Sequence, residues 1–190
     1  KRGCSSVASR PKSRKGKRRK IGLVDIRRAH LKAKARRLIF IKLPEEDAEP
    51  GKVGMLNFSL YGTRDAASNW EAEYTDCLVS AGFKQGVSNP CYFVHEEFDV
   101  ELEVHGDDFP IIPNEDGIEW TVGVLRARYE LKLQTIIGPD VYDVKEEIFL
   151  NRVVRWVGKD ENGLFRIKFE EHQDMERSSS GHWSCSMRSQ

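Results

Sequence analysis

The chain has 190 residues, of which 39% are hydrophobic and 32% charged, and its formal net charge is +1. This composition predicts one polar, globular domain with a core of its own. No apolar run approaches the length of a membrane-spanning helix and the N-terminus lacks the apolar stretch of a secretory signal, so we expect an intracellular protein, cytoplasmic or nuclear, without membrane contact.

Residues 1–20 differ in charge from the rest of the chain. They hold ten Lys or Arg and no Asp or Glu, whereas residues 21–190 carry 21 basic and 30 acidic residues, a net charge of −9. A basic arm on an acidic body predicts a disordered segment that binds nucleic acid or serves as a nuclear address. The alternative is a solvated tail without a partner. The candidate nucleic-acid-binding residues are Lys12, Arg14, Lys15, Lys17, Arg18, Arg19 and Lys20.

The first half of the body is predicted to hold three strands and a helix. The strands are expected at 21–26, at 37–44 and at the start of 52–62. A helix is predicted over 63–82, with Thr63 as N-cap and Gly82 just beyond its C-terminus. Apolar side chains recur along it at three- and four-residue steps and form one stripe. The stripe consists of Ala67, Trp70, Tyr74, Cys77, Leu78 and Ala81.

The second half alternates strands with one further helix. The predicted elements are strands at 91–97 and 100–105, a helix at 115–130, a loop at 134–146, and strands at 147–158 and 163–169. Residues 171–190 lack periodicity and are predicted to be a disordered tail, which leaves 21–170 as the domain. The element order predicts an α+β fold, an antiparallel sheet with two helices packed on one face.

The four cysteines, Cys4, Cys77, Cys91 and Cys185, are widely scattered. No pair has the spacing of a zinc finger or a redox motif, so we expect no disulfide-linked partner. Cys77 and Cys91 lie among apolar residues and are interpreted as small core side chains.

Acidic residues occur at two strand-associated positions. Asp25 interrupts the apolar run 21–26, and Asp107 and Asp108 follow Gly106 between two strand-like runs. Each site has a simpler interpretation, a strand end or a tight turn with its charges in water. On neighbouring central strands, however, the three carboxylates would converge and repel one another unless cations neutralised them. Two Mg²⁺ or Mn²⁺ ions in that position would suit in-line phosphoryl or nucleotidyl transfer.

Five blocks of the sequence resemble one protein family. "SLYGTRDAASNW" (59–70) is similar to a block of the copia-type LTR-retrotransposon reverse transcriptases, and "VDIRRAHLKAKARRLIFIKLP" (24–44) resembles their first catalytic-aspartate block. The others are "VSNPCYFV" (87–94), "HGDDF" (105–109) and "IFLNRVVRW" (148–156). The blocks occur in the family's order from about 21 to 170, so the chain is identified as a partial copy of such a reverse transcriptase.

The resemblance implies a polymerase palm whose fingers and thumb are largely missing from this chain. It implies Asp25, Asp107 and Asp108 as catalytic metal ligands for two Mg²⁺ or Mn²⁺ ions. It implies an RNA or DNA template–primer and a deoxynucleoside triphosphate as partners. The nucleotide-binding positions that it implies are His30, Arg64 and Asp65.

Four positions depart from the family's pattern. His30 replaces an aromatic residue that stacks under the incoming sugar, Asp65 replaces a glutamine, and His105 and Gly106 replace the tyrosine and the apolar residue that usually precede the acidic pair. These changes predict a weakly active or inactive copy. Two alternatives remain: a catalytically dead relic that binds nucleic acid through its basic arm, and a small metal-binding structural domain without a nucleic-acid role.

Overall fold

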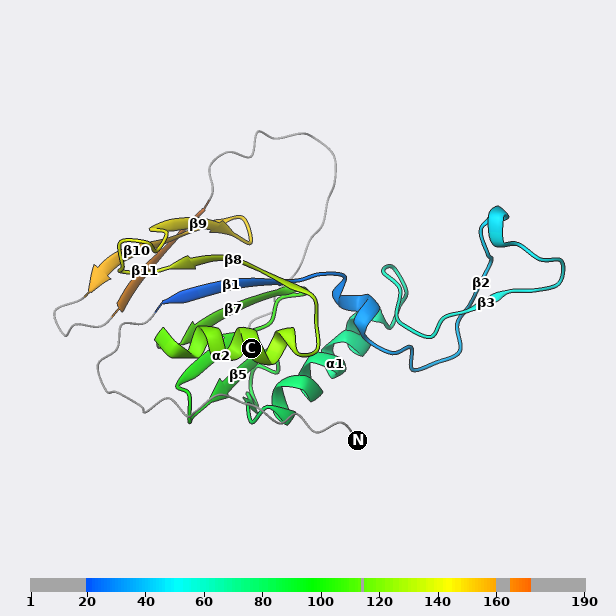
Figure 1. Cartoon of the computed structure of the whole chain (residues 1–190), viewed down its shortest axis with the longest axis horizontal. Helices are drawn as coiled ribbons and strands as arrows, with labels where there is room; N and C mark the ends of the chain where they lie inside the picture. Colours follow the sequence, from blue (N-terminus) through cyan, green and yellow to red (C-terminus); the bar gives the residue numbers. More distant parts are fainter. Residues whose placement is uncertain (1–19, 114, 160–164, 172–190) are drawn as a thin grey trace.

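The computed structural model describes residues 20–113, 115–159 and 165–171. The basic arm and the C-terminal tail, both predicted to be disordered, lie outside the described residues except for Lys20 and Glu171. Within the described part, the chain is an α+β fold with two antiparallel sheets, two α-helices and a projecting hairpin (Figure 1). None of the described helices is both long and apolar enough to cross a membrane.

The larger sheet has six strands in the order β4-β5-β6-β7-β1-β8, and every neighbouring pair is antiparallel. Its first strand in the chain, β1, lies between β7 and β8 and so has a neighbour on each side. The bounds are β1 (Ile21–Ile26), β4 (Lys84–Gln85), β5 (Tyr92–His95), β6 (Val100–Glu103), β7 (Asp108–Pro113) and β8 (Leu131–Ile137).

Both α-helices pack on one face of this sheet, as predicted. Helix α1 (Ala66–Ser80) buries Trp70 and Tyr74 against the sheet, where Trp70 lies edge-on to Phe109. Helix α2 (Glu115–Arg126) buries an apolar stripe on the same side, consisting of Ile118, Val122 and Leu125. Successive residues of a strand point to opposite faces, so Val24, which belongs to this core, marks the helix side of β1. Each large side chain buried there contributes about 1.5–3 kcal/mol.

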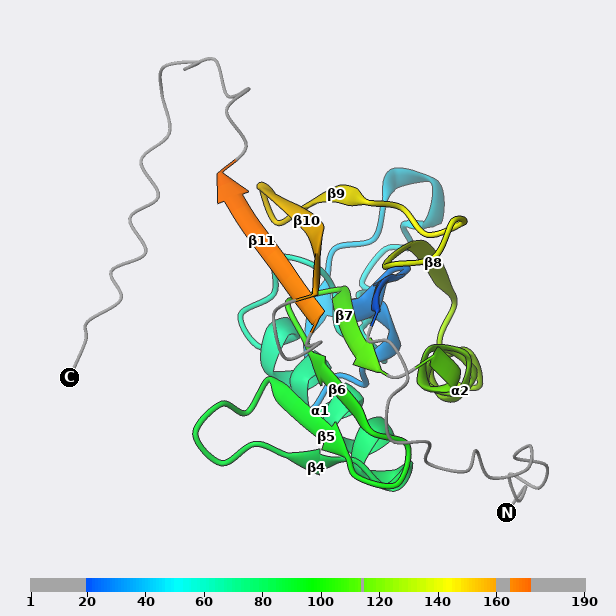
Figure 2. The same cartoon turned by 90° about the vertical axis from the view of Figure 1, so that its left-hand side faces the viewer.

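The opposite face of β1 is covered in part by a three-stranded sheet, in the order β11-β10-β9. Its strands are β9 (Glu146–Phe149), β10 (Arg152–Lys159) and β11 (Phe165–Glu171). The side chains of Ile21 and Leu23 on β1 point away from the helices and pack with Ile137 and Val154 in a second core. Figure 2 shows this sheet at the β8 end of the larger sheet, far from β4.

Part of the segment between β1 and α1 forms an arm that projects from the body (Figure 1). The arm contains β2 (Phe40–Ile41) paired with β3 (Gly54–Met55) and the short 3-10 helix η2 (Glu45–Asp47), whereas the 3-10 helix η1 (Ala29–Lys32) packs against α1 in the body. The strands predicted at 37–44 and 52–62 shrink to two residues each, because they pair only with each other and join neither sheet. Apolar residues of the arm stay exposed as a result, among them Leu38 and Val53.

Several local predictions were wrong at the level of boundaries, among them the helix expected at 115–130, which ends at Arg126. The expected loop at 134–146 begins with strand residues, because β8 continues to Ile137 in register with β1. The expected strand at 147–158 is divided by a turn at Leu150 and Asn151, which both have positive φ. Helix α1 begins at Ala66 rather than Thr63, whose hydroxyl donates instead to the Leu60 carbonyl oxygen, at 2.8 Å. Gly82 is confirmed as the residue beyond the helix, with φ +98.

Candidate active site

Asp25 and Asp108 lie directly opposite each other on adjacent strands. They are register partners in the antiparallel pair β1–β7. Side chains directly opposite in such a pair point to the same face of the sheet. That face is the one turned away from the helices, since Asp25 shares it with Leu23 and Ile21 of the second core. Both carboxylates are half-buried there.

Asp107 belongs to the tight turn that joins β6 to β7. The backbones of His105 and Asp108 exchange two hydrogen bonds, at 2.9 and 3.0 Å, which leaves Gly106 and Asp107 as a two-residue loop. The Ile26 amide donates to the Asp107 carbonyl oxygen at 2.8 Å, so the turn is fastened to the end of β1. The fold thus brings the backbones of all three aspartates to one place.

Gly106 and Trp70 set the conformation of this turn. Gly106 has φ +65, whereas Asp107 does not have a positive φ, which is the pattern of a type II′ turn with glycine at its first position. Glycine therefore fits this turn rather than loosening it. The Trp70 indole N–H donates to the Gly106 carbonyl oxygen at 2.7 Å. Because Trp70 is only 2% exposed, helix α1 holds the acidic turn from inside the core.

The electrostatics of the three aspartates reflect their closeness. Burial raises the pKa of Asp108, and the negative charges of Asp25 and Asp107 raise it further, against a smaller opposite effect of His105. In the described part of the chain, no three side chains of His, Cys, Asp or Glu converge on one point. A cation bound between the three aspartates would relieve the repulsion among their carboxylates. For all three to share one cation, however, the carboxylates would have to turn toward it.

His30 and Tyr61 lie beside the aspartates. His30 is in η1, and its ring meets that of Tyr61 edge-on, with centroids 4.4 Å apart. Burial raises the pKa of Tyr61, and the negative charges of Asp107 and Asp25 raise it further. The Nδ1 atom of His30 is buried and has no hydrogen-bond partner in the described structure. The aromatic surface next to the aspartates therefore comes from His30 and Tyr61 together, although the resemblance to the family implied no role for Tyr61.

Arg64 and Asp65 precede helix α1. Arg64 is exposed. Asp65 accepts a hydrogen bond from Arg37 at 2.9 Å, and this contact is the main cause that holds the pKa of Asp65 below its usual range. The negative charge at this position is thus partly offset by Arg37. Asn69 is buried and donates to the Ser59 hydroxyl oxygen at 2.9 Å, which ties the segment before α1 to the helix.

Lys132 is a candidate site residue that the sequence did not indicate. It lies directly opposite Asp25 on β8, so its side chain leaves the sheet on the same face as the carboxylates. It is exposed. Its position depends on the pairing of β8 with β1, including a bulge between Leu23 and Val24, and no local pattern at 131–137 reveals that register.

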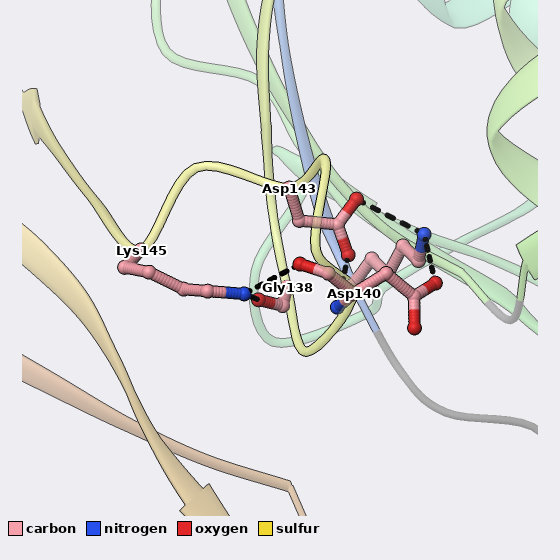
Figure 3. Close-up of polar contacts among 5 residues, drawn as sticks. Gly138, Asp140, Asp143 and Lys145 are labelled. Atoms are coloured by element: carbon pink, nitrogen blue, oxygen red, sulfur yellow. Dashed lines mark hydrogen bonds and ion pairs between the residues drawn. The ribbon is translucent and has the colours of Figure 1, made fainter.

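The structure places Lys20 differently from the prediction that it contacts nucleic acid. Its ammonium group lies 2.8 Å from Asp140 and 3.0 Å from Asp143, and its side chain is only 11% exposed. Burial disfavours the charge of Lys20, but these two carboxylates outweigh that effect and raise its pKa. Figure 3 shows the loop concerned, in which Lys145 donates to the carbonyl oxygens of Gly138 and Asp140. Lys20 is therefore engaged inside the fold, and Lys12, Arg14, Lys15, Lys17, Arg18 and Arg19 lie outside the described residues.

Cys77 and Cys91, the two cysteines within the described residues, are free. Cys77 is buried, as expected for a core side chain, whereas Cys91 is partly exposed.

A family model described as reverse transcriptase (RNA-dependent DNA polymerase) matches residues 15–137. The match spans more than half of the chain and includes β1, the SLYG block, helices α1 and α2, and the acidic turn. No curated protein matches the chain.

Proposed function

The chain belongs to the copia-type family of reverse transcriptases, and from this membership we propose that its larger sheet and two helices form the palm of an RNA-directed DNA polymerase. The proposed reaction transfers a deoxynucleotide from its triphosphate to a primer 3′-hydroxyl on an RNA or DNA template. The observation that carries the proposal is the register of β1 against β7, which sets Asp25 opposite Asp108 on the face free of helices.

Asp25, Asp107 and Asp108 are the proposed ligands of two Mg²⁺ or Mn²⁺ ions. Carboxylate oxygens are the ligands that these cations prefer. When bound, the ions would supply a lowered pKa of the attacking hydroxyl and charge stabilisation on the leaving pyrophosphate. The chain's own contribution is rigid placement: Trp70 and the Ile26 amide hold the acidic turn against the end of β1.

The remaining residues of the site have proposed roles in binding the nucleotide. His30 and Tyr61 offer an aromatic wall beside the carboxylates, against which a sugar or base can pack. Lys132 and Arg64 are exposed cations suited to phosphate oxygens. Because Arg37 partly offsets the charge of Asp65, this carboxylate would repel a bound triphosphate less than an unpaired carboxylate would.

A second candidate function is nucleic-acid binding without catalysis. The observation that favours it is the basic stretch 1–20, with ten Lys or Arg and no acidic residue. Such a stretch binds phosphates without sequence preference. In this case the aspartates would be remnants of an ancestral site.

The test combines metal binding with primer extension. Mn²⁺ binding is followed by electron paramagnetic resonance, and extension is measured on an RNA template with Mg²⁺ or Mn²⁺. We expect the wild-type chain to bind Mn²⁺ and Asp108→Asn to lose that binding together with any extension. Asp47→Asn, which removes an exposed carboxylate on the projecting hairpin, is the matched control and keeps both. A wild-type chain that neither binds Mn²⁺ nor extends a primer would contradict the polymerase proposal and favour the second candidate.

A further inference from the structure

A second basic stretch lies inside the body, directly after β1. Residues 27–37, "RRAHLKAKARR", contain six Lys or Arg and no acidic residue, although residues 21–190 as a whole carry a net charge of −9. We call it the inner basic segment. It begins two residues after Asp25 and includes η1, so it starts at the end of the strand that carries the candidate site.

The inner basic segment is held in place by two small buried residues. Ala29 and Ala33 are both 0% exposed and belong to the main core, and η1 packs against α1. The backbone continues as a hydrogen-bonded structure, since the Ser59 amide donates to the Ala33 carbonyl oxygen and the Ala35 amide to that of Asn57. The long cationic side chains therefore extend from a fixed backbone, and binding them to a partner orders less of the chain than binding a free tail does.

Two of the six cations already have carboxylate partners. Arg27 pairs with Glu130 at 2.7 Å, and Arg37 pairs with Asp65 at 2.9 Å. For the other four, Arg28, Lys32, Lys34 and Arg36, the described part of the structure shows no ion pair. Arg28, Lys34 and Arg36 are exposed and Lys32 is half-buried.

Nearby carboxylates offset this charge only in part. Arg27 is the main cause that lowers the pKa of Glu130, and the charges of Lys32 and Arg28 lower it further, although only Arg27 forms an ion pair with this carboxylate. Arg36 borders a shallow hollow on α1 together with Glu71 and Asp76, and Asp76 already accepts a hydrogen bond from Arg128. Near Glu130, three cations thus face one anion.

We propose that the inner basic segment binds the sugar–phosphate backbone of a nucleic-acid strand through Arg28, Lys32, Lys34 and Arg36. The inference rests on the proposed function for its choice of partner, because a polymerase site at Asp25 requires a strand of nucleic acid at the same end of β1. The cations sit where that polyanion passes the carboxylates, and they offset the repulsion that an acidic body imposes on it. The body then has a phosphate-binding surface of its own, separate from the basic arm.

The experiment measures binding of a fluorescent DNA primer–template to the full-length chain over a series of salt concentrations. The test variant carries Arg28→Gln, Lys32→Gln, Lys34→Gln and Arg36→Gln. The control carries Lys42→Gln, Arg126→Gln, Arg152→Gln and Arg166→Gln, four exposed cations from other parts of the fold, so that both variants lose the same net charge. Far-ultraviolet circular dichroism verifies that both are folded.

We expect the test variant to flatten the plot of log affinity against log salt by up to about 3.6, since each phosphate contact on duplex DNA contributes about 0.9. The control is expected to keep the wild-type slope. Equal slopes for the two variants would overturn the proposal, as would a test variant that loses affinity for anionic lipid vesicles but not for the primer–template. Mn²⁺ binding by the wild-type chain is measured separately. If the test variant flattens the salt dependence but the wild-type chain does not bind Mn²⁺, the result supports the basic surface and contradicts the polymerase proposal.

Discussion

The contact between Trp70 and the acidic turn leads to a prediction about Trp70→Phe. The substitution keeps an aromatic ring among Tyr74, Phe109 and Tyr129, whose centroids lie 5.6, 6.3 and 5.2 Å away, and removes the indole N–H that donates to Gly106. The lost hydrogen bond costs about 1 kcal/mol. The smaller ring leaves unfilled volume in a closely packed core, which adds about 1 kcal/mol. We expect the free energy of unfolding to fall by about 2 kcal/mol.

The chain offers a matched control in Trp156. Its indole N–H is buried without a hydrogen-bond partner in the described structure. Trp156→Phe therefore loses ring volume and weakens a cation–π contact in which the Lys145 Nζ lies 5.1 Å from the ring centroid, but it also removes an unsatisfied donor. The one gain and the two losses nearly cancel, so we expect the free energy of unfolding to change by less than about 1 kcal/mol. Urea unfolding, analysed by linear extrapolation, compares the two variants.

Hydrogen exchange then locates the effect of Trp70→Phe. The amides of His105 and Asp108 form the two hydrogen bonds that close the turn. If Trp70 positions the turn, protection of these two amides decreases by more than the loss of global stability explains, whereas the amide of Leu102 in the middle of the sheet follows global stability. Equal destabilisation by both tryptophan variants, with His105 and Asp108 still protected, would refute this reasoning.

Two further predictions concern charged groups. Because the folded protein raises the pKa of Asp108, the ionised form of Asp108 destabilises the fold, and Asp108→Asn should unfold at a higher urea concentration than the wild type at neutral pH. This advantage should disappear at acidic pH, where Asp108 is protonated in both the folded and the unfolded state. An advantage that persisted at acidic pH would contradict the electrostatic cause. Lys20→Met should lower the free energy of unfolding by roughly 2–3 kcal/mol, because Asp143, whose side chain is 7% exposed, loses its cation. Adding Asp143→Asn should restore part of that stability, and a purely additive loss would argue against the ion pair.

Much of the candidate site could be read from neighbouring residues. The apolar run 21–26 interrupted by Asp25, and the glycine before two aspartates between strand-like runs, are local patterns, and they indicated a strand and a turn that the structure contains. The stripe through Trp70, Tyr74 and Leu78 likewise predicted which face of α1 is buried. The predicted α+β class and the placement of both helices on one face followed from the order of such elements.

Contacts between residues far apart in the chain decided the rest. Lys132 lies opposite Asp25 only because of the register of β8, and Trp70 donates to the Gly106 carbonyl oxygen across 36 residues of sequence. Lys20 belongs by its sequence to the basic arm, but it is enclosed by Asp140 and Asp143, more than a hundred residues away. Periodicity and turn chemistry act between near neighbours and are visible in a single sequence, whereas pairing register and ion-pair partners depend on how whole sheets and helices pack.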